Sequence, residues 1–563
     1  MAESLQQLAQ RCNELYNKGD LASVVKLGGR LTQHPEAEAV HHNLVGMARA
    51  QTGDLVGARR CFKQAHRLKP GNADYARHYG WVSHQLGIRY SAINALKEAA
   101  RLAPQAVEHH WLLAHALDAA GEMVDARRKY RDALKVDRDC LEAARGLVRT
   151  LVRDGRLLEA RNEAEALLRR FPGDPKLRTF AAQANAGSNR DYALALLREE
   201  LAREQPTSDA VEVVVTEGLL ELRDMAIDGA QRVLERRRED SQERAQMQHL
   251  LAQLLDRGGE YETAFRHYEE GNRIARSVLQ ARNRLWSRQQ VQKRTDATIR
   301  RFPKKLSEVA DQFAIDGEVT PLWIMGLPRS GKTSLETILD QHSEVAAGFE
   351  RGIIGDLLHT AEEQTGQPVV ELFRRGDDTV RHALQQAQAQ RDHEAAGARY
   401  QTDTRPANLR FLGFLAATSP QAKFVFIRRD PLDLGFALYA KFFPSMDGWD
   451  TSLRDIAHAI HQHHQLMDFW EGILGDRVTR ISYEELVGDE EGVTRRVLDL
   501  AGLSWESALA PPEEEARIAS PGHEQIGRSR LDRRFVGLAE PYRERLGPLV
   551  EELDKLGELP AGR

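Results

Sequence analysis

A 34-residue period in the positions of glycine constrains the fold of the N-terminal half more than any other feature. Five glycines stand at this interval: Gly19, Gly53, Gly87, Gly121 and Gly155. Alanines keep the same register: Ala58, Ala92, Ala126 and Ala160, then Ala65, Ala99 and Ala133. Large side chains and prolines share it too: Phe62, Leu96 and Tyr130, then Pro70, Pro104, Pro172 and Pro206. One period in several residue types predicts a stack of repeated structural units.

The residue types suit a unit of two antiparallel helices. Glycine fits the turn between them, where a positive φ costs it little. Alanine lets two helices cross closely, and proline ends the second helix. The pattern is similar to the tetratricopeptide repeat and is strong over residues 37–172. It is weaker over 1–36 and 173–240, and it returns at Gly259, Ala264 and Tyr268. The resemblance implies an array whose concave surface binds a protein or peptide. A purely structural role as a scaffold or dimerisation platform remains an alternative.

The chain is too long for one core, because its 563 residues exceed the size at which single domains stop growing. Residues 272–302 have a helical pattern without the repeat. After residue 318 the residue pattern changes, and a short apolar run indicates a buried strand. We therefore expect an array over 1–271, a connecting helical segment over 272–318 and a second domain over 319–556.

Composition narrows the partners and the compartment. A formal net charge of -5 gives no reason to expect nucleic-acid binding. No apolar run approaches the about 18 residues of a membrane helix, and the first residues lack a signal-peptide layout. The three cysteines, Cys12, Cys61 and Cys140, are too few for a disulfide framework or a zinc site. We expect a cytoplasmic protein without metal, nucleic-acid or membrane ligands.

Residues 326–333 read G-L-P-R-S-G-K-T, which fits the phosphate-binding spacing G-x-x-x-x-G-K-[ST]. An apolar strand pattern precedes this loop and a helix pattern follows it. In that setting the N–H groups of the loop and the helix N-terminus converge on an anion. Arg329 and Lys332 add charge-assisted hydrogen bonds. The loop therefore predicts a phosphate site.

A second strand, Phe424–Ile427, ends in Arg428 and Arg429. A kinase or NTPase needs a carboxylate near such a strand end to hold Mg²⁺. The carboxylate here, Asp430, follows the arginines and is expected to cap the next helix. Ligands of α/β domains bind at the carboxyl ends of strands, so the arginine pair favours a second phosphate. A kinase or NTPase that uses Lys332 remains an alternative.

Five segments resemble bacterial proteins that join tetratricopeptide repeats to a sulfotransferase domain related to tyrosylprotein sulfotransferase. They are the loop with its helix (326–345), Gly348-Phe349-Glu350, D-T-R-P-A-N (403–408), R-D-P-L-D (429–433) and S-Y-E-E-L-V with Tyr483. The resemblance implies a P-loop-like α/β domain with a parallel sheet. It also implies transfer of a sulfuryl group from 3′-phosphoadenosine-5′-phosphosulfate (PAPS) to a hydroxyl. A peptide tyrosine, a small phenol and a carbohydrate all remain possible acceptors.

The same resemblance assigns roles to residues. Glu350 matches the general base, and Arg329 and Arg405 are the further catalytic candidates. The residues expected to bind PAPS are Pro328, Arg329, Ser330, Gly331, Lys332, Thr333, Arg429, Tyr483, Ser529 and Arg533.

Three positions depart from the family pattern. Lys332 stands where the family has the first threonine of the loop, and Thr404 stands where it has a lysine. Ala437 stands where it has a serine that would bind the 3′-phosphate. A non-catalytic adaptor with a degenerate domain is therefore a further alternative. The histidines of H-A-I-H-Q-H-H-Q (458–465) are interpreted as part of a packing helix rather than as a metal site.

Overall fold

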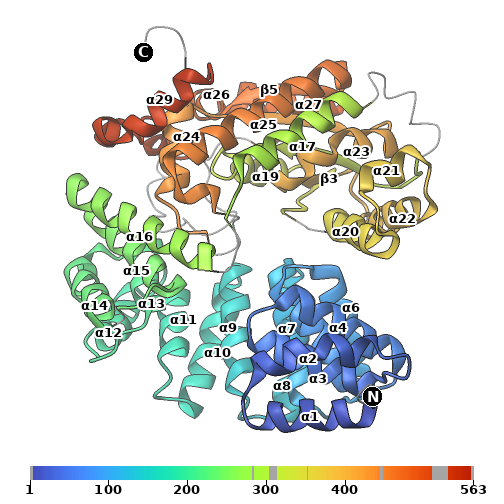
Figure 1. Ribbon diagram of the computed structural model, residues 1–563. Helices are drawn as coiled ribbons and strands as arrows, with labels where there is room; N and C mark the ends of the chain where they lie inside the picture. Colours follow the sequence, from blue (N-terminus) through green and yellow to red (C-terminus); the bar gives the residue numbers. More distant parts are fainter. Residues whose placement is uncertain are drawn as a thin grey trace. The chain divides into compact units, whose positions relative to one another are not determined.

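The computed structural model describes residues 4–236, 238–281, 285–302, 314–350, 353–443, 448–509 and 531–559 (Figure 1). The chain divides into two compact units, Met1–Pro172 and Gly173–Arg563.

The first unit consists of helices that pack against their neighbours in sequence order. They are α1 (Leu5–Asn17), α2 (Leu21–Gln33), α3 (Ala39–Gln51), α4 (Leu55–Leu68), α5 (Ala73–Gln85), α6 (Arg89–Leu102), α7 (Val107–Ala120), α8 (Met123–Val136), α9 (Leu141–Arg153) and α10 (Leu157–Arg170). Each periodic glycine lies in the turn inside a helix pair, and Gly53 and Gly121 both have a φ of 85°. Ala58 and Ala126 are fully buried. The predicted helical array is confirmed, for the expected reasons.

The second unit begins with further helices of the array and continues into an α/β domain. The helices are α11 (Pro175–Asn185), α12 (Arg190–Leu201), α13 (Ser208–Thr216), α14 (Arg223–Arg236), α15 (Gln242–Arg257), α16 (Tyr261–Ala281) and α17 (Arg288–Arg301). Since α16 runs unbroken from Tyr261 to Ala281, residues 271 and 272 lie inside one helix. The proposed domain boundaries stay a prediction.

The α/β domain is built on a five-stranded sheet in the order β2-β3-β1-β4-β5, and every pair is parallel. The strands are β1 (Thr320–Met325), β2 (Val345–Ala346), β3 (Tyr400–Asp403), β4 (Lys423–Arg428) and β5 (Val478–Ser482). The central strand β1 is apolar and almost wholly buried, as a parallel strand covered on both faces must be. The predicted parallel sheet is confirmed.

Helices connect the strands. Between β1 and β3 lie α19 (Lys332–Leu339), α20 (Ile353–Thr365), α21 (Val369–Arg374) and α22 (Asp378–Glu394). The 3₁₀ helix η2 (Pro406–Phe411) and α23 (Leu412–Thr418) lead to β4, and α24 (Pro431–Tyr439) and α25 (Leu453–Leu474) lead to β5. After β5 come α26 (Tyr483–Gly488), α27 (Glu490–Ala501), the 3₁₀ helices η6 (Arg533–Phe535) and η7 (Glu540–Leu546), and α29 (Gly547–Lys555). No helix in the described ranges is long and apolar enough to cross a membrane.

The last helices of the array and the α/β domain share one hydrophobic core. Tyr268 of α16 packs edge-on against Phe436 of α24, with ring centroids 5.9 Å apart. Phe436 in turn stacks on Tyr542 of η7 at 4.1 Å. The buried amide of Asn272 donates to the carbonyl of Tyr439 at the end of α24. Burial of these groups makes α16 part of the support of α24.

We expect Asn272→Ala to lower the free energy of unfolding by about 1–3 kcal/mol, because it leaves the buried Tyr439 carbonyl without its donor. Arg273→Ala is the matched control on the next residue, whose side chain is 55% exposed and makes only surface ion pairs. Its effect is expected to stay below about 1 kcal/mol. Urea unfolding of both variants measures the difference. Equal losses would contradict a specific role of the Asn272 contact.

Candidate functional site

The loop between β1 and α19 is tightly folded. Gly331 caps α19 in the left-handed region, with a φ of 98°, and Arg329 also has a positive φ of 68°. A Cβ added at Gly331 would lie 2.5 Å from the ring of Tyr483. Ser330 is 1% exposed, and its hydroxyl has no hydrogen-bond partner among the described residues. Such a loop, with an unused buried hydroxyl and the N-terminus of a helix, can hold an anion.

Arg429 lies beside this loop, because β4 is hydrogen-bonded to β1 and both strands end at the same edge of the sheet. Its guanidinium donates to the carbonyl of Arg329 at 2.9 Å and to that of Phe535, and it lies 5.0 Å from the centre of the Tyr483 ring. Its Nε is buried and finds no acceptor in the part of the chain that is described. Burial lowers the pKa of Arg429, yet arginine remains a cation.

The neighbouring Arg428 points elsewhere. It donates to Asp468 of α25 at 2.6 Å. Asp430 caps α24 and accepts hydrogen bonds from the N–H groups of Leu432 and Asp433, as the sequence predicted. The two arginines at the end of β4 therefore diverge, and only Arg429 faces the loop.

The segment around η6 closes this side of the site. The Tyr483 hydroxyl donates to the carbonyl of Asp532 at 3.2 Å, and the guanidinium of Arg329 lies 5.7 Å from the centre of the Phe535 ring. Arg533 is exposed, and Ser529 lies outside the described residues. The contacts of this basic segment come from its backbone and from Phe535, which the sequence analysis did not single out.

The remaining loop residues have different exposures. Pro328 is half-buried, and Arg329 and Thr333 are exposed. Lys332 is 3% exposed, and its ammonium leaves the loop for the end of β3. There its Nζ donates to the carbonyl of Thr404 at 2.7 Å and lies 3.4 Å from Oε1 of Glu350. Burial lowers the pKa of Lys332, and the charge of Glu350 opposes this shift.

Arg405 does not share that position. Its N–H donates to Asp403, and its guanidinium lies near α20, where a Cβ added at Gly355 would be 3.3 Å from Nη1. Lys332 reaches the carbonyl of Thr404, the residue that stands in place of the family lysine, and the carboxylate of Glu350.

Two further acids lie in this cluster. Burial raises the pKa of Glu336 to about 7 and that of Asp403 to about 7. The sequence analysis missed Glu336, which is fully buried in α19 among Leu335, Ile338 and Leu339. An acidic residue within the apolar face of a short helix is the signal that marks it.

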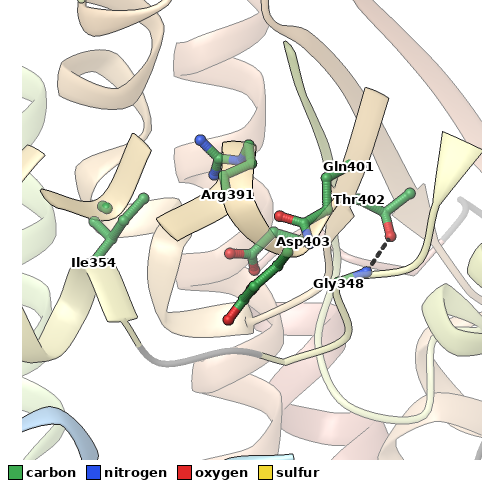
Figure 2. A pocket seen from close by; sticks show the side chains of 8 residues that line it. Gly348, Ile354, Arg391, Gln401, Thr402 and Asp403 are labelled. Carbon is green, nitrogen blue, oxygen red and sulfur yellow. Dashed lines mark hydrogen bonds between the residues drawn. The ribbon is translucent and has the colours of Figure 1, made fainter. Parts of the chain in front are cut away.

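A cavity of about 20 Å³ adjoins the chain segment that leads to Glu350. Figure 2 shows Gln401, Thr402 and Asp403 of β3 on one side and Arg391 on another, with the N–H of Gly348 bonded to the Thr402 hydroxyl. This volume holds about one water molecule and not an aromatic ring. Glu350 itself is 53% exposed, so an acceptor can approach it from solvent.

No group of three or more histidine, cysteine, aspartate or glutamate residues suited to a metal is present in the described ranges. Three histidines of α25 pair with carboxylates: His458 with Glu552, and His461 and His464 with Glu558. The Nε2 of the fourth, His463, is buried and has no hydrogen-bond partner among the described residues. The site thus combines two cationic centres at one sheet edge with a carboxylate beside one of them. It can bind two phosphate groups and accept a proton from a hydroxyl.

Comparison with known proteins agrees with this geometry. Residues 321–507 match the model of the sulfotransferase family, and residues 119–184 match the tetratricopeptide repeat. An uncharacterised protein of Aquifex aeolicus is 23% identical over 56% of this chain and 42% of its own length. The protein-tyrosine sulfotransferase of Drosophila melanogaster is 25% identical over 36% of this chain and 42% of its own.

Protein-tyrosine sulfotransferase 2 of Gallus gallus is 26% identical, over 44% of this chain and 66% of its own length. The chain thus spans less than half the length of the first two of these relatives. A solved tetratricopeptide repeat protein from Parabacteroides merdae superimposes with a TM-score of 0.38 at 16% identity, covering 45% of this chain and all of its own. Residues 321–507 are similar to the sulfotransferase family and follow a segment similar to tetratricopeptide repeats, in a chain distantly similar to protein-tyrosine sulfotransferases.

Proposed function

We propose that the protein transfers a sulfuryl group from PAPS to a hydroxyl, and that the acceptor is a tyrosine of a peptide or protein. The observation that carries this proposal is the pair of cationic centres at the ends of β1 and β4. Ser330 in the loop and Arg429 beside it each keep a buried polar atom without a partner among the described residues. Two phosphate groups on one nucleotide, at its 5′ and 3′ positions, would use both atoms.

The residues then divide the work. The N–H groups of loop 326–331, with Arg329, Ser330 and Thr333, bind the 5′-phosphosulfate. Arg429, held by Tyr483 and the η6 segment, binds the 3′-phosphate. Lys332 directs its charge to the transferring group, at the position that the family lysine would reach from residue 404.

Glu350 acts as the base. It takes the proton of the acceptor hydroxyl while the acceptor oxygen forms a bond to sulfur. The bond from sulfur to the 5′-phosphate oxygen breaks, and 3′-phosphoadenosine 5′-phosphate (3′,5′-ADP) leaves. The exposure of Glu350 favours an acceptor carried on a peptide, and the array is proposed to bind that protein or another partner. The count of three cysteines, too few for a disulfide framework, favours a cytoplasmic location.

Calorimetry with 3′,5′-ADP, ATP and GTP, each with and without Mg²⁺, tests the proposal. Binding of 3′,5′-ADP that does not need Mg²⁺ is expected. Mg²⁺-dependent binding of ATP or GTP would instead indicate a kinase or NTPase. Binding of none of them would indicate an adaptor.

Arg429→Ala is expected to weaken 3′,5′-ADP binding by about 1.5–3 kcal/mol, the value of a hydrogen bond to a charged group. Affinity for adenosine 5′-phosphosulfate should hardly change, because that ligand has no 3′-phosphate. Arg428→Ala is the matched control, since Arg428 bonds to Asp468 and faces away from the loop. Equal losses for both ligands would show that Arg429 supports the fold and not the 3′-phosphate.

A further inference from the structure

Glu336 is an unusual residue for the interior of this domain. It is fully buried, and a buried carboxyl group is costly unless hydrogen-bond donors surround it. Three donors do so. The N–H of Phe349 lies 2.9 Å from Oε1, the Thr402 hydroxyl donates to the same oxygen, and the Thr404 hydroxyl lies 3.2 Å from Oε2. One side chain of α19 thereby ties the end of β3 to the segment that carries Glu350.

The backbone of that segment is strained. Phe349 is a non-glycine residue with a φ of 53°, a conformation that persists only where its surroundings hold it. The side chain of Phe349 is 43% exposed, and that of Glu350 is 53% exposed, so neither is fixed by burial. The Phe349 backbone is held on both sides, because its carbonyl also accepts from the N–H of Thr404 at 3.3 Å.

Gly348 shows how closely the turn is pressed onto β3. A Cβ at this position would lie 2.0 Å from the carbonyl oxygen of Thr402. The Gly348 N–H also donates to the Thr402 hydroxyl, which itself donates to Glu336. Glu336, Thr402 and the Gly348–Phe349 backbone thus form one connected hydrogen-bond network.

We propose that Glu336 is a positioning residue for the catalytic base: by holding the Phe349 N–H and the two threonines of β3, it fixes where the Glu350 carboxylate stands. This inference rests on the proposed function, because it assigns Glu336 a role through Glu350. A displacement of the base by about 1 Å costs roughly 10²-fold in rate, so such a residue affects turnover more than nucleotide binding.

Glu336→Ala is expected to lower kcat about 10–100-fold while the affinity for 3′,5′-ADP stays within about threefold. Glu336→Gln keeps an oxygen that can accept from the Phe349 N–H, and it should recover most of the loss. Thr337→Ala is the matched control on the next residue of α19, where the hydroxyl donates to the helix carbonyl of Thr333. It should turn over like the wild type.

The decisive measurement is a double-mutant cycle with Glu350→Gln. If Glu336 acts through Glu350, then Glu336→Ala should cost less than about threefold once Glu350 is absent. The same full loss in that background would overturn the proposal, as would a loss that appears in 3′,5′-ADP affinity and not in kcat. Should Glu336→Ala not fold, Thr402→Val, which removes one donor to the Glu336 carboxyl group, is judged by the same cycle.

Failure of this inference is distinguishable from failure of the proposed function. A wild-type protein that neither binds 3′,5′-ADP nor transfers sulfuryl groups contradicts the function. A wild-type protein that does both, with a Glu336→Ala variant of unchanged kcat, contradicts only the role of Glu336.

Discussion

Glu350→Gln is expected to lower sulfuryl transfer about 10²–10⁴-fold, the usual contribution of a positioned general base. Glutamine has nearly the same shape but cannot take the proton of the acceptor hydroxyl. The affinity for 3′,5′-ADP should remain close to that of the wild type, because the carboxylate faces Lys332 and solvent and not Arg429 or the η6 segment. The measurement is turnover of tyrosine peptides with radiolabelled PAPS.

The variant should fold normally. Glu350 is 53% exposed, and its contact with Lys332 is long at 3.4 Å, so its loss costs the fold little. Glu344→Gln provides a matched control, since Glu344 is also exposed and is held through its backbone: its carbonyl accepts from Arg399 and Tyr400, and its N–H donates to His342. A variant that turns over like the wild type would mean that another group takes the proton.

Much of the architecture could be predicted from residue types alone. Positions that need a positive φ, as at Gly53 and Gly121, favour glycine over other residues and can therefore be recognised in the sequence. The loop before Lys332 and the cap at Asp430 are likewise local features. Their residues are close in sequence and therefore also close in the folded chain. A few neighbouring residues are enough to determine such features, and the structure contains them as predicted.

Other parts of the site depend on contacts between distant segments. The sequence marks Glu336 only as an acid within an apolar helix face. Its hydrogen bonds depend on Phe349, Thr402 and Thr404, which are brought to it from up to 68 residues away. Phe535 meets Arg329 only because the chain returns to the sheet edge after β5. Sequence patterns report periodicity and local turns, and they do not report which side chain fills a given position in space.

The shared core of the second unit is a further case. The α24 helix begins directly after Arg429 and Asp430 and packs through Phe436 on Tyr268 of α16. Helices that belong to the array by their repeat pattern therefore support the element that carries the arginine of the proposed 3′-phosphate site. A repeat pattern marks where each helix lies in its own pair, and it gives no sign of the domain that the last pair meets.

Exchange of Lys332 and Thr404 is expected to show whether turnover requires a positive charge at one position or requires Lys332 itself. Lys332→Thr should lower turnover about 10²–10³-fold, the cost of losing one donor that stabilises the transition state. The reason is that its ammonium is buried between the carbonyl of Thr404 and the carboxylate of Glu350. Electrostatic interactions are stronger at such a buried position than in water. Calorimetry with 3′,5′-ADP shows how much of the loss belongs to binding.

The double variant Lys332→Thr/Thr404→Lys should recover at least about tenfold of that loss. A lysine at 404 begins beside the position of the Lys332 ammonium, and the acids Glu336 and Asp403 lie near that position. Thr404→Lys alone is the control for the new side chain. It should bring no gain, since a second cation beside Lys332 is repelled. A double variant no more active than Lys332→Thr, or a Lys332→Thr variant with wild-type turnover, would show that the charge of Lys332 is not used in transfer. Recovery would mean that turnover requires a positive charge at the end of β3, and that a lysine of either the loop or the strand can supply it.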